Sequence, residues 1–235
     1  MKKRVEYPDC HKCFWKHSSI FCDLPKDDTE LLNTSKGFSV YKKGQVIFNE
    51  GSYPHGVYCI YEGKVKLSKL GDYGKEQIIQ LSKSGELIGY RALLSGDKYF
   101  LSATTMEDST VCLISREIFF QLIEKNPKLA INVIKVLAKE LKELKNNLTY
   151  LAQKPVRERV AEALLHIKEI YGFEKDNATV NLRLTREDLA NFVGTATETT
   201  IRVLSEFKGE KLIAGGWKRI KILNVPGLKK IANVA

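Results

Sequence analysis

The sequence has no long apolar run, since no stretch approaches the roughly 20 apolar residues that cross a bilayer. Its first residues, MKKRVEYPDC, carry a basic tip without the apolar segment that a signal peptide requires. Both absences argue against membrane-inserted and secreted proteins. We therefore expect a cytoplasmic protein with no membrane partner.

Cysteine is also scarce, with five residues in a chain of 235. An odd number in a chain large enough to bury its own core makes a disulfide framework the weaker interpretation and a metal or redox role the stronger one. Nothing resembles a catalytic triad, a phosphate-binding loop or a pair of acid and base carboxylates, and the four histidines form no evident cluster. We therefore expect that the protein is not an enzyme.

The charge that is present is strongly basic, +10 overall, and its excess rises toward the C-terminus. Residues 152–235 carry 15 basic and 10 acidic side chains, which is half of the net excess. Clustered Lys and Arg gain from counterion release on DNA, although a basic solvated surface has the same composition. The distribution therefore favours double-stranded DNA as a partner of the C-terminal part.

Between residues 38 and 114, short apolar runs such as VIF, VYCIY, VKLSKL, QIIQL and LIGY alternate with glycines. Short β-rich runs cut by glycines at this spacing predict an antiparallel roll or barrel. The stretch EGKVKLSKLGDYGKEQIIQL predicts a pair of hairpins, with one turn at Glu62-Gly63 and the other between Gly71 and Gly74.

The apolar period changes at Ser115, where a short helix up to Glu124 is followed by Asn126-Pro127, a pair typical of a helix start. The long helix expected next carries an apolar stripe spaced 3, 4, 3, 4, 3, formed by Ile134, Leu137, Leu141, Leu144, Leu148 and Leu151. The stripe could lie on the domain's own core. Its narrowness and its charged flanks favour a two-stranded coiled coil, and hence a homodimer.

Lys154-Pro155 ends this helix, and we place a domain boundary there. PVRERVAEALLHIKEIYG then predicts an amphipathic helix that ends at Gly172, and TVNLRL alternates like a strand. Near the C-terminus, KLIAGGWKRIKIL has two short β-type runs around Gly215-Gly216, which predict a hairpin wing.

The segment LTREDLANFVGTATETTIRVLSEFKGEKLI carries the most specific pattern in the chain. Thr185 with Asp188 and Thr195 with Glu198 both fit the capping box, a Ser or Thr followed three residues later by an acid, so a helix is expected to begin at each. Gly194 lies between them as the turn. The pattern therefore predicts a helix-turn-helix.

The second of these helices is expected to enter the major groove with the face formed by Thr197, Glu198, Ile201 and Arg202. Glu198 could accept a hydrogen bond from a cytosine amino group, and Arg202 could bond guanine or phosphate. Ile201 could contact a thymine methyl group. The alternative for this face is a surface ion pair between Glu198 and Arg202.

In this order the parts resemble the Crp/Fnr superfamily of bacterial transcription regulators over almost the whole chain. The matching stretches are KKGQVIFNEG, VYCIYEGKVKL, GELIG and LTREDLANFVGTATETTIRVL. The resemblance implies an α+β fold with an N-terminal antiparallel β-roll of the cyclic-nucleotide-binding type, a long dimerisation helix and a C-terminal winged helix-turn-helix. The expected parts are an arm at residues 1–30, a sensor roll at 31–126, the helix at 127–153 and the DNA-binding domain at 154–235.

The resemblance also implies a signal-dependent regulator that binds palindromic promoter sites as a homodimer, with RNA polymerase as a further partner. In the family, a Glu and an Arg four positions later contact bases, and these match Glu198 and Arg202. The residue before that arginine is usually serine or glycine, and here it is Ile201.

Cyclic-nucleotide binders of the family hold the ribose with a Glu after the second glycine of the GELIG-like turn and the phosphate with an Arg-Ser pair some ten residues later. This chain has Gly89-Tyr90-Arg91 and Tyr99-Phe100-Leu101 at these places. A cyclic phosphate needs charge-assisted donors, so nucleotide binding is disfavoured, although Arg91 could substitute. Two alternatives stay open: a regulator with another small-molecule effector or with no cofactor, and a nucleotide-sensing module that acts on a partner protein without binding DNA.

The oxygen-sensing branch, similar to the fumarate and nitrate reduction regulator, binds a 4Fe-4S cluster through three N-terminal cysteines and one at the end of the β-roll. Cys10, Cys13 and Cys22 in CHKCFWKHSSIFC match the first three, and Cys112 in DSTVCLIS matches the fourth. Eight residues separate Cys13 from Cys22, where the family has five. The resemblance thus implies control by oxygen or redox state.

Two other interpretations of the arm stay open. Cys10, Cys13, His17 and Cys22 could close a tetrahedral zinc site, or the arm could hold reduced cysteines with no metal. Cys59, in the alternating run VYCIY, is expected to be a packed core thiol.

Overall fold

The structure, a computed structural model, describes residues 7–71, 73–216 and 218–234. The chain divides into two compact units, residues 1–69 with 80–141 and residues 70–79 with 142–235. The first residues of the expected arm, 1–6, and Trp217 of the expected wing lie outside the described residues.

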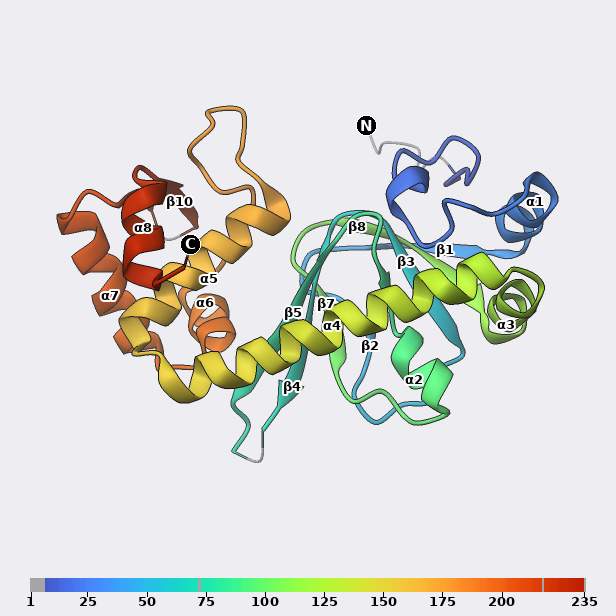
Figure 1. The fold of residues 1–235 in the computed structure, drawn as a ribbon, viewed down its shortest axis with the longest axis horizontal. Coiled ribbons are helices and arrows are strands. Elements are labelled where there is room, and N and C mark those ends of the chain that lie inside the picture. The colour runs from blue at the N-terminus through green and yellow to red at the C-terminus, as the bar shows by residue number, and fades with distance from the viewer. Residues whose placement is uncertain (1–6, 72, 217, 235) are drawn as a thin grey trace. The chain divides into compact units, whose positions relative to one another are not determined.

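The glycine-punctuated runs form a β-roll of two four-stranded sheets (Figure 1). The first sheet has the order β1-β8-β3-β6, with the strands Gly37–Tyr41, Ser109–Ser115, Gly56–Glu62 and Leu87–Ile88. The second has the order β2-β7-β4-β5, with the strands Val46–Phe48, Ser102–Thr105, Lys64–Leu70 and Glu76–Lys83. Ile60, Val65 and Val111 of these strands are buried, and the two antiparallel sheets confirm the predicted roll.

Only one of the two predicted hairpins forms. β4 and β5 are neighbours, and their turn is closed by hydrogen bonds from Gly71 N to Lys75 O (2.9 Å) and from Gly74 N to Gly71 O (2.9 Å). The hairpin at Glu62-Gly63 is wrong, because β3 and β4 belong to different sheets and the chain passes between them there. Gly63 has φ 124°, and a Cβ on it would lie 2.1 Å from Ser109 Oγ, so the corner requires glycine.

Three helices and part of the arm pack together beside the roll. They are α1 (Lys26–Ser35), α2 (Tyr90–Ser95) and α3 (Arg116–Lys125), and the arm itself contains a 3₁₀ turn, η1 (Lys16–Ser18). Their shared apolar cluster consists of Phe21, Leu24, Leu32, Val57, Tyr90, Leu93, Ile114, Phe119, Leu122, Leu129 and Val133. The arm therefore contributes to the core of the first unit and does not merely lie on its surface.

The long helix α4 spans Pro127–Gln153, so it begins and ends where Asn126-Pro127 and Lys154-Pro155 predicted. Leu129 and Val133 near its start are buried in the cluster just described. No described helix is long and apolar enough to cross a membrane.

The second unit contains a helix-turn-helix and a two-stranded wing, as predicted (Figure 1). Its elements are α5 (Val156–Tyr171), α6 (Arg186–Val193), α7 (Thr197–Gly209), β9 (Ile213–Gly216), β10 (Arg219–Ile222) and α8 (Val225–Ala232). α5 packs against α6, α7 and α8. The Gly172 stop of α5 is confirmed, with φ 68° at that glycine.

Two features of this unit differ from the sequence analysis. TVNLRL has the alternating burial of a strand, but only isolated bridges pair it, Phe173 with Val180 and Thr179 with Lys221, so the predicted strand is wrong. The last helix, α8, was not predicted. It begins at a cap that the sequence does show, since Asn224 Oδ1 accepts a hydrogen bond from Gly227 N (2.8 Å).

Candidate DNA-binding surface and cysteine pocket

The first helix of the helix-turn-helix begins at a complete capping box. Thr185 Oγ1 accepts a hydrogen bond from Asp188 N (2.9 Å), and Thr185 N donates to Asp188 Oδ2 (3.1 Å). The helix ends at Gly194, whose φ of 73° is a left-handed conformation that favours glycine. The turn predicted at this glycine is confirmed.

The turn is fixed from α5 by an arginine. Arg159 Nη1 donates to the carbonyl oxygens of Val193 (2.9 Å) and Gly194 (3.3 Å), which satisfies acceptors left open at the end of α6. The Arg159 carbonyl in turn accepts a hydrogen bond from Tyr150 Oη of α4 (2.5 Å). The last turns of α4 are thus connected to the loop that orients α7.

The second predicted capping box, Thr195 with Glu198, is wrong. The N-cap of α7 is Ala196, and no side chain caps the helix. Thr195 N instead donates to Ala190 O (3.1 Å), which completes the end of α6. The local sequence could not show whether Thr195 caps α7 or completes the end of α6, because a threonine between two helices is compatible with both.

The predicted reading face of α7 lies opposite the helix's buried side. Thr200, Val203, Leu204 and Phe207 are buried. The other face presents Glu198 and Arg202 as exposed side chains and Thr197 and Ile201 as half-buried ones. The ion pair considered between Glu198 and Arg202 does not form, because Arg202 Nη1 bonds Glu206 Oε1 at 2.9 Å.

A groove runs between this helix and the wing. Its lining comes from the start of α6, the first residue of α7 and both wing strands, and consists of Leu184, Thr185, Arg186, Glu187, Thr197, Gly216, Lys218 and Arg219. Lys218 and Arg219 are exposed. Basic side chains beside a reading helix are the type that contacts the DNA backbone.

The apolar stripe of α4 is largely exposed on the chain. Ile134, Leu141, Leu144, Leu148 and Leu151 are exposed, while Leu137 is partly buried against the first unit's core. A row of exposed apolar side chains at heptad spacing is the pattern of a helix that pairs with another helix.

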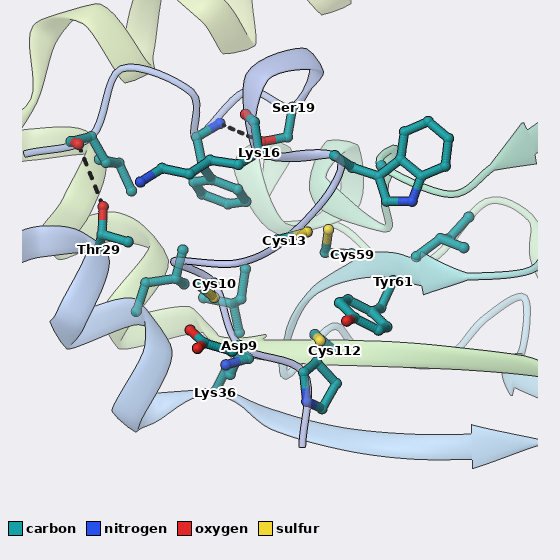
Figure 2. A pocket seen from close by; sticks show the side chains of 18 residues that line it. Asp9, Cys10, Cys13, Lys16, Ser19, Thr29, Lys36, Cys59, Tyr61 and Cys112 are labelled. Atoms are coloured by element: carbon teal, nitrogen blue, oxygen red, sulfur yellow. Dashed lines mark hydrogen bonds between the residues drawn. The ribbon is translucent and has the colours of Figure 1, made fainter. Parts of the chain in front are cut away.

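Four of the five cysteines line one pocket in the first unit (Figure 2). Cys59 of β3 and Cys112 of β8 are directly opposite residues in the strand pairing. Cys10 and Cys13 approach from the arm, and the cavity between arm and sheet measures about 50 Å³. All five cysteines are free thiols. A water molecule needs about 10–15 Å³ of such a cavity, so the space between arm and sheet can hold a few water molecules.

The arm is held in this place by specific contacts. Cys10 N donates to Asn33 Oδ1 (2.9 Å) of α1, and Lys16 N donates to Cys13 O (3.0 Å) where η1 begins. Trp15 lies against Gly85, where an added Cβ would be 2.9 Å from the Trp15 Cβ. Glycine at residue 85 is what allows the arm to approach the sheet this closely.

Burial is the main influence on the pKa of three thiols of the pocket. It raises the pKa of Cys10 and of Cys59, and it raises the pKa of Cys112 to about 12. The charge of Lys36, whose residue is 6% exposed, opposes each of these shifts. A cation beside buried thiols stabilises their thiolate forms.

Cys22, the third member of the predicted ligand set, is not among the residues that line the pocket. Its Sγ lies 3.9 Å from Asn132 Nδ2 on α4. Burial raises the pKa of the Cys22 thiol, and the charge of Asp23 adds to the shift. Cys59, expected to be a packed core thiol, lines the pocket; burial raises the pKa of its thiol, although the residue as a whole is half-buried. Sequence reasoning missed it because its strand partner is 53 positions away.

Among the described residues, no group of three or more His, Cys, Asp or Glu side chains is close enough to hold a single metal ion. A tetrahedral zinc site would need its sulfurs about 3.8 Å apart, given zinc–sulfur bonds of about 2.3 Å. In a 4Fe-4S cluster each thiolate binds a different iron, so its sulfurs are more widely spaced. The donor set of the pocket consists of four thiols, two from the arm and one each from β3 and β8, and its chemistry fits such a cluster.

Aromatic rings pack together around Tyr99, which stands where the sequence analysis placed the phosphate-binding pair of the family's nucleotide binders. Tyr99 is buried and stacks on Phe48 with ring centroids 4.0 Å apart, and Phe48 also packs against Tyr58 at 5.5 Å. Arg91, considered as a substitute phosphate ligand, lies with its Nε 3.7 Å from Glu140 Oε2 of α4.

Comparison with known proteins covers both units. Residues 38–126 match the cyclic nucleotide-binding domain family, and residues 158–231 match the Crp-like helix-turn-helix domain family. The chain is 31% identical over 197 residues to the fumarate and nitrate reduction regulatory protein of Vibrio cholerae serotype O1, covering 83% of this chain and 78% of that protein. It is 29% identical over 217 residues to the cyclic AMP receptor protein of Thermus thermophilus, covering 92% and 98%. The structure of FixK2 from Bradyrhizobium japonicum is similar with a TM-score of 0.76 at 25% identity, covering 85% of this chain and 98% of that one.

Proposed function

We propose that this chain, which belongs to the Crp/Fnr family of transcription regulators, acts as a homodimer on a palindromic DNA site under the control of oxygen or redox state. As a member of this family it is a DNA-binding transcription regulator and not an enzyme. The proposal adds that the protein is a homodimer, that its DNA site is palindromic and that oxygen or redox state is the signal.

The exposed face of α7 supports the DNA contacts. Glu198 would accept a hydrogen bond from a cytosine amino group, Arg202 would bond guanine or a phosphate, and Ile201 would contact a thymine methyl group. Thr197 at the helix start borders the groove that Lys218 and Arg219 line, so these two would meet the backbone beside the bases read by α7.

The stripe on α4 supports the homodimer. A second copy covering Ile134 to Leu151 would remove exposed apolar surface from water on both chains. A two-fold dimer presents two copies of α7, which read half-sites about one helical turn, or 34–36 Å, apart. The symmetry of the protein would therefore be matched by a palindromic site, from which RNA polymerase would be recruited or excluded.

The thiol pocket is the observation that carries the proposed signal. A 4Fe-4S cluster held there would supply an oxygen- and redox-sensitive centre. The chain's own residues would bind it through thiolates of Cys10, Cys13 and Cys112 and of a fourth cysteine, for which the sequence pattern implies Cys22. Lys36 would offset part of the negative charge of the thiolates.

The test combines composition with DNA binding. Protein purified without air is expected to be brown and to contain about four irons and four sulfides per chain. DNA selected from a random pool should then show a palindrome, with binding that weakens as salt rises and changes after exposure to air. A colourless, iron-free preparation would defeat the proposed signal, and absence of DNA binding in every redox state would defeat the proposed site.

A further inference from the structure

The pairing of β3 with β8 places two thiols side by side. Cys59 and Cys112 are directly opposite each other in adjacent antiparallel strands. Directly opposite residues point to the same face of the sheet, with Cβ atoms about 4.5–5.5 Å apart. The two thiols therefore lie next to each other on one face of the sheet, and their pairing does not depend on the position of the arm.

The arm completes the set with two more thiols on the same side. Figure 2 shows Cys13 beside Cys59, and Cys10 and Cys112 line the same pocket. The backbone of Cys10 is held by Asn33, and Trp15 is packed on Gly85, so the arm is fixed on both sides of Cys13.

A buried cation is independent evidence that the pocket binds an anionic group. Lys36 Nζ donates to Asn33 O (3.1 Å) and Asn33 Oδ1 (2.7 Å), and it lies 4.4 Å from the ring centroid of Tyr7. Among the described residues no carboxylate pairs with this ammonium group, although the residue is only 6% exposed. Burying a charge with neutral partners is costly, and thiolates of Cys10 and its neighbours would compensate it.

Cys22 contacts the start of α4 and not the other thiols. Nine positions beyond Cys13 and past the turn η1, it lies where Asn132 Nδ2 of α4 also donates to Ile20 O (3.2 Å) and Asp23 Oδ2 (3.4 Å). Its neighbours Phe21 and Leu24 are buried in the apolar cluster. Both of these neighbours line the pocket, whereas Cys22 contacts Asn132, and this contact would have to break for Cys22 to join the other thiols.

We propose that the four thiolate ligands are Cys10, Cys13, Cys59 and Cys112, and that Cys22 is not a ligand. This rests on the proposed function, in that a 4Fe-4S cluster is bound. Each of the four thiols gives its proton to water as its sulfur binds iron. Two ligands then come from the sheet and two from the arm, so that the site joins the two segments.

The test compares Cys59→Ser with Cys22→Ser. Cys112→Ser is the reference, because Cys112 is a ligand both in the set implied by the sequence and in the set proposed here. Each is purified without air beside the wild type, and iron, sulfide and visible absorbance are measured per chain. Wild type and Cys22→Ser are expected to retain about four irons, and the other two variants fewer than about one. Circular dichroism of the iron-free forms checks that each variant is folded.

A second measurement uses no variant. Wild-type protein, loaded and then stripped with a chelator, is pulsed with N-ethylmaleimide in both states, and each cysteine is quantified by mass spectrometry. Cys59 is expected to be labelled only after stripping, and Cys22 at the same rate in both states. Protection of Cys22 with unprotected Cys59, or an iron-free Cys22→Ser beside a loaded Cys59→Ser, overturns the assignment while leaving the proposed function intact. A wild type that binds no iron overturns both.

Discussion

Replacing Leu141 and Leu148 by glutamate is expected to separate the proposed homodimer into folded monomers. These side chains lie one heptad apart on the α4 stripe, and the two residues are 54% and 70% exposed on the single chain. Because they contribute little to the core of either unit, the free energy of unfolding of the protomer should change by less than about 0.5 kcal/mol.

The expected loss of dimer stability follows from these exposed fractions. Full burial of a leucine side chain contributes about 1.5–3 kcal/mol. Covering the exposed fractions of both leucines therefore contributes about 2–4 kcal/mol per protomer and about 4–7 kcal/mol per dimer. At about 1.4 kcal/mol per factor of ten, the dimer Kd should rise by about three to five powers of ten, before any repulsion between glutamates.

Sedimentation equilibrium over a range of protein concentrations measures this Kd, and circular dichroism checks the helix content. The matched control is Asn146→Glu with Thr149→Glu, which adds the same charge to exposed positions of α4 outside the stripe. An unchanged Kd for the double leucine variant, or an equal loss in the control, would refute the assignment of the stripe as the dimer interface.

Three further substitutions test other parts of the structure. Arg202→Ala should weaken DNA binding by about 1–3 kcal/mol in fluorescence anisotropy, without loss of stability, because the side chain pairs only at the surface. Gly194→Ala should cost about 1–2 kcal/mol of stability in urea unfolding, since its φ is 73°, whereas Gly209→Ala, with open space around its Cβ position, should not. Hydrogen bonds from Lys125 and Asn126 lower the pKa of buried Asp28, so its stabilisation is complete above about pH 3.9 and is lost as the pH falls. Asp28→Asn should thus lower the free energy of unfolding by about 1.5–3 kcal/mol at pH 7 and by less in acid, and exposed Asp27→Asn should leave it unchanged.

The features that the sequence predicted correctly depend on neighbours along the chain. The heptad stripe, the capping box at Thr185 and the stops at Pro155 and Gly172 all use residues within one or two helical turns, and each is present. The order of β-roll, long helix and winged helix-turn-helix followed from the succession of such local patterns.

The features that it missed depend on distant parts of the chain. Glu62-Gly63 has the chemistry of a hairpin turn, and only the separation of β3 and β4 into different sheets makes it a corner. Cys59 has the pattern of a core residue, and only its register with Cys112 brings it to the pocket. Strand register is set by the whole roll, so no pattern of adjacent residues contains it.

The arm offers one path by which the pocket could control α4, because its residues contact both. One end holds Cys10 and Cys13, and the other end meets the start of α4 at Asn132, just before the stripe begins at Ile134. Moving a two-state equilibrium from 1:99 to 99:1 takes about 5.5 kcal/mol of differential interaction. Hydrogen bonds from Asn132, at about 0.5–1.5 kcal/mol each, fall short of this.

The apolar anchors of the arm reach the required size. Phe21 and Leu24 are both buried in the cluster that includes Leu129 and Val133 of α4, and full burial of such side chains contributes about 1.5–3 kcal/mol each. A signal that only loosened the cysteine end of the arm would leave these contacts in place and α4 unchanged. Control of α4 through the arm therefore requires that the segment around Phe21 and Leu24 pack differently against α4 in the two states.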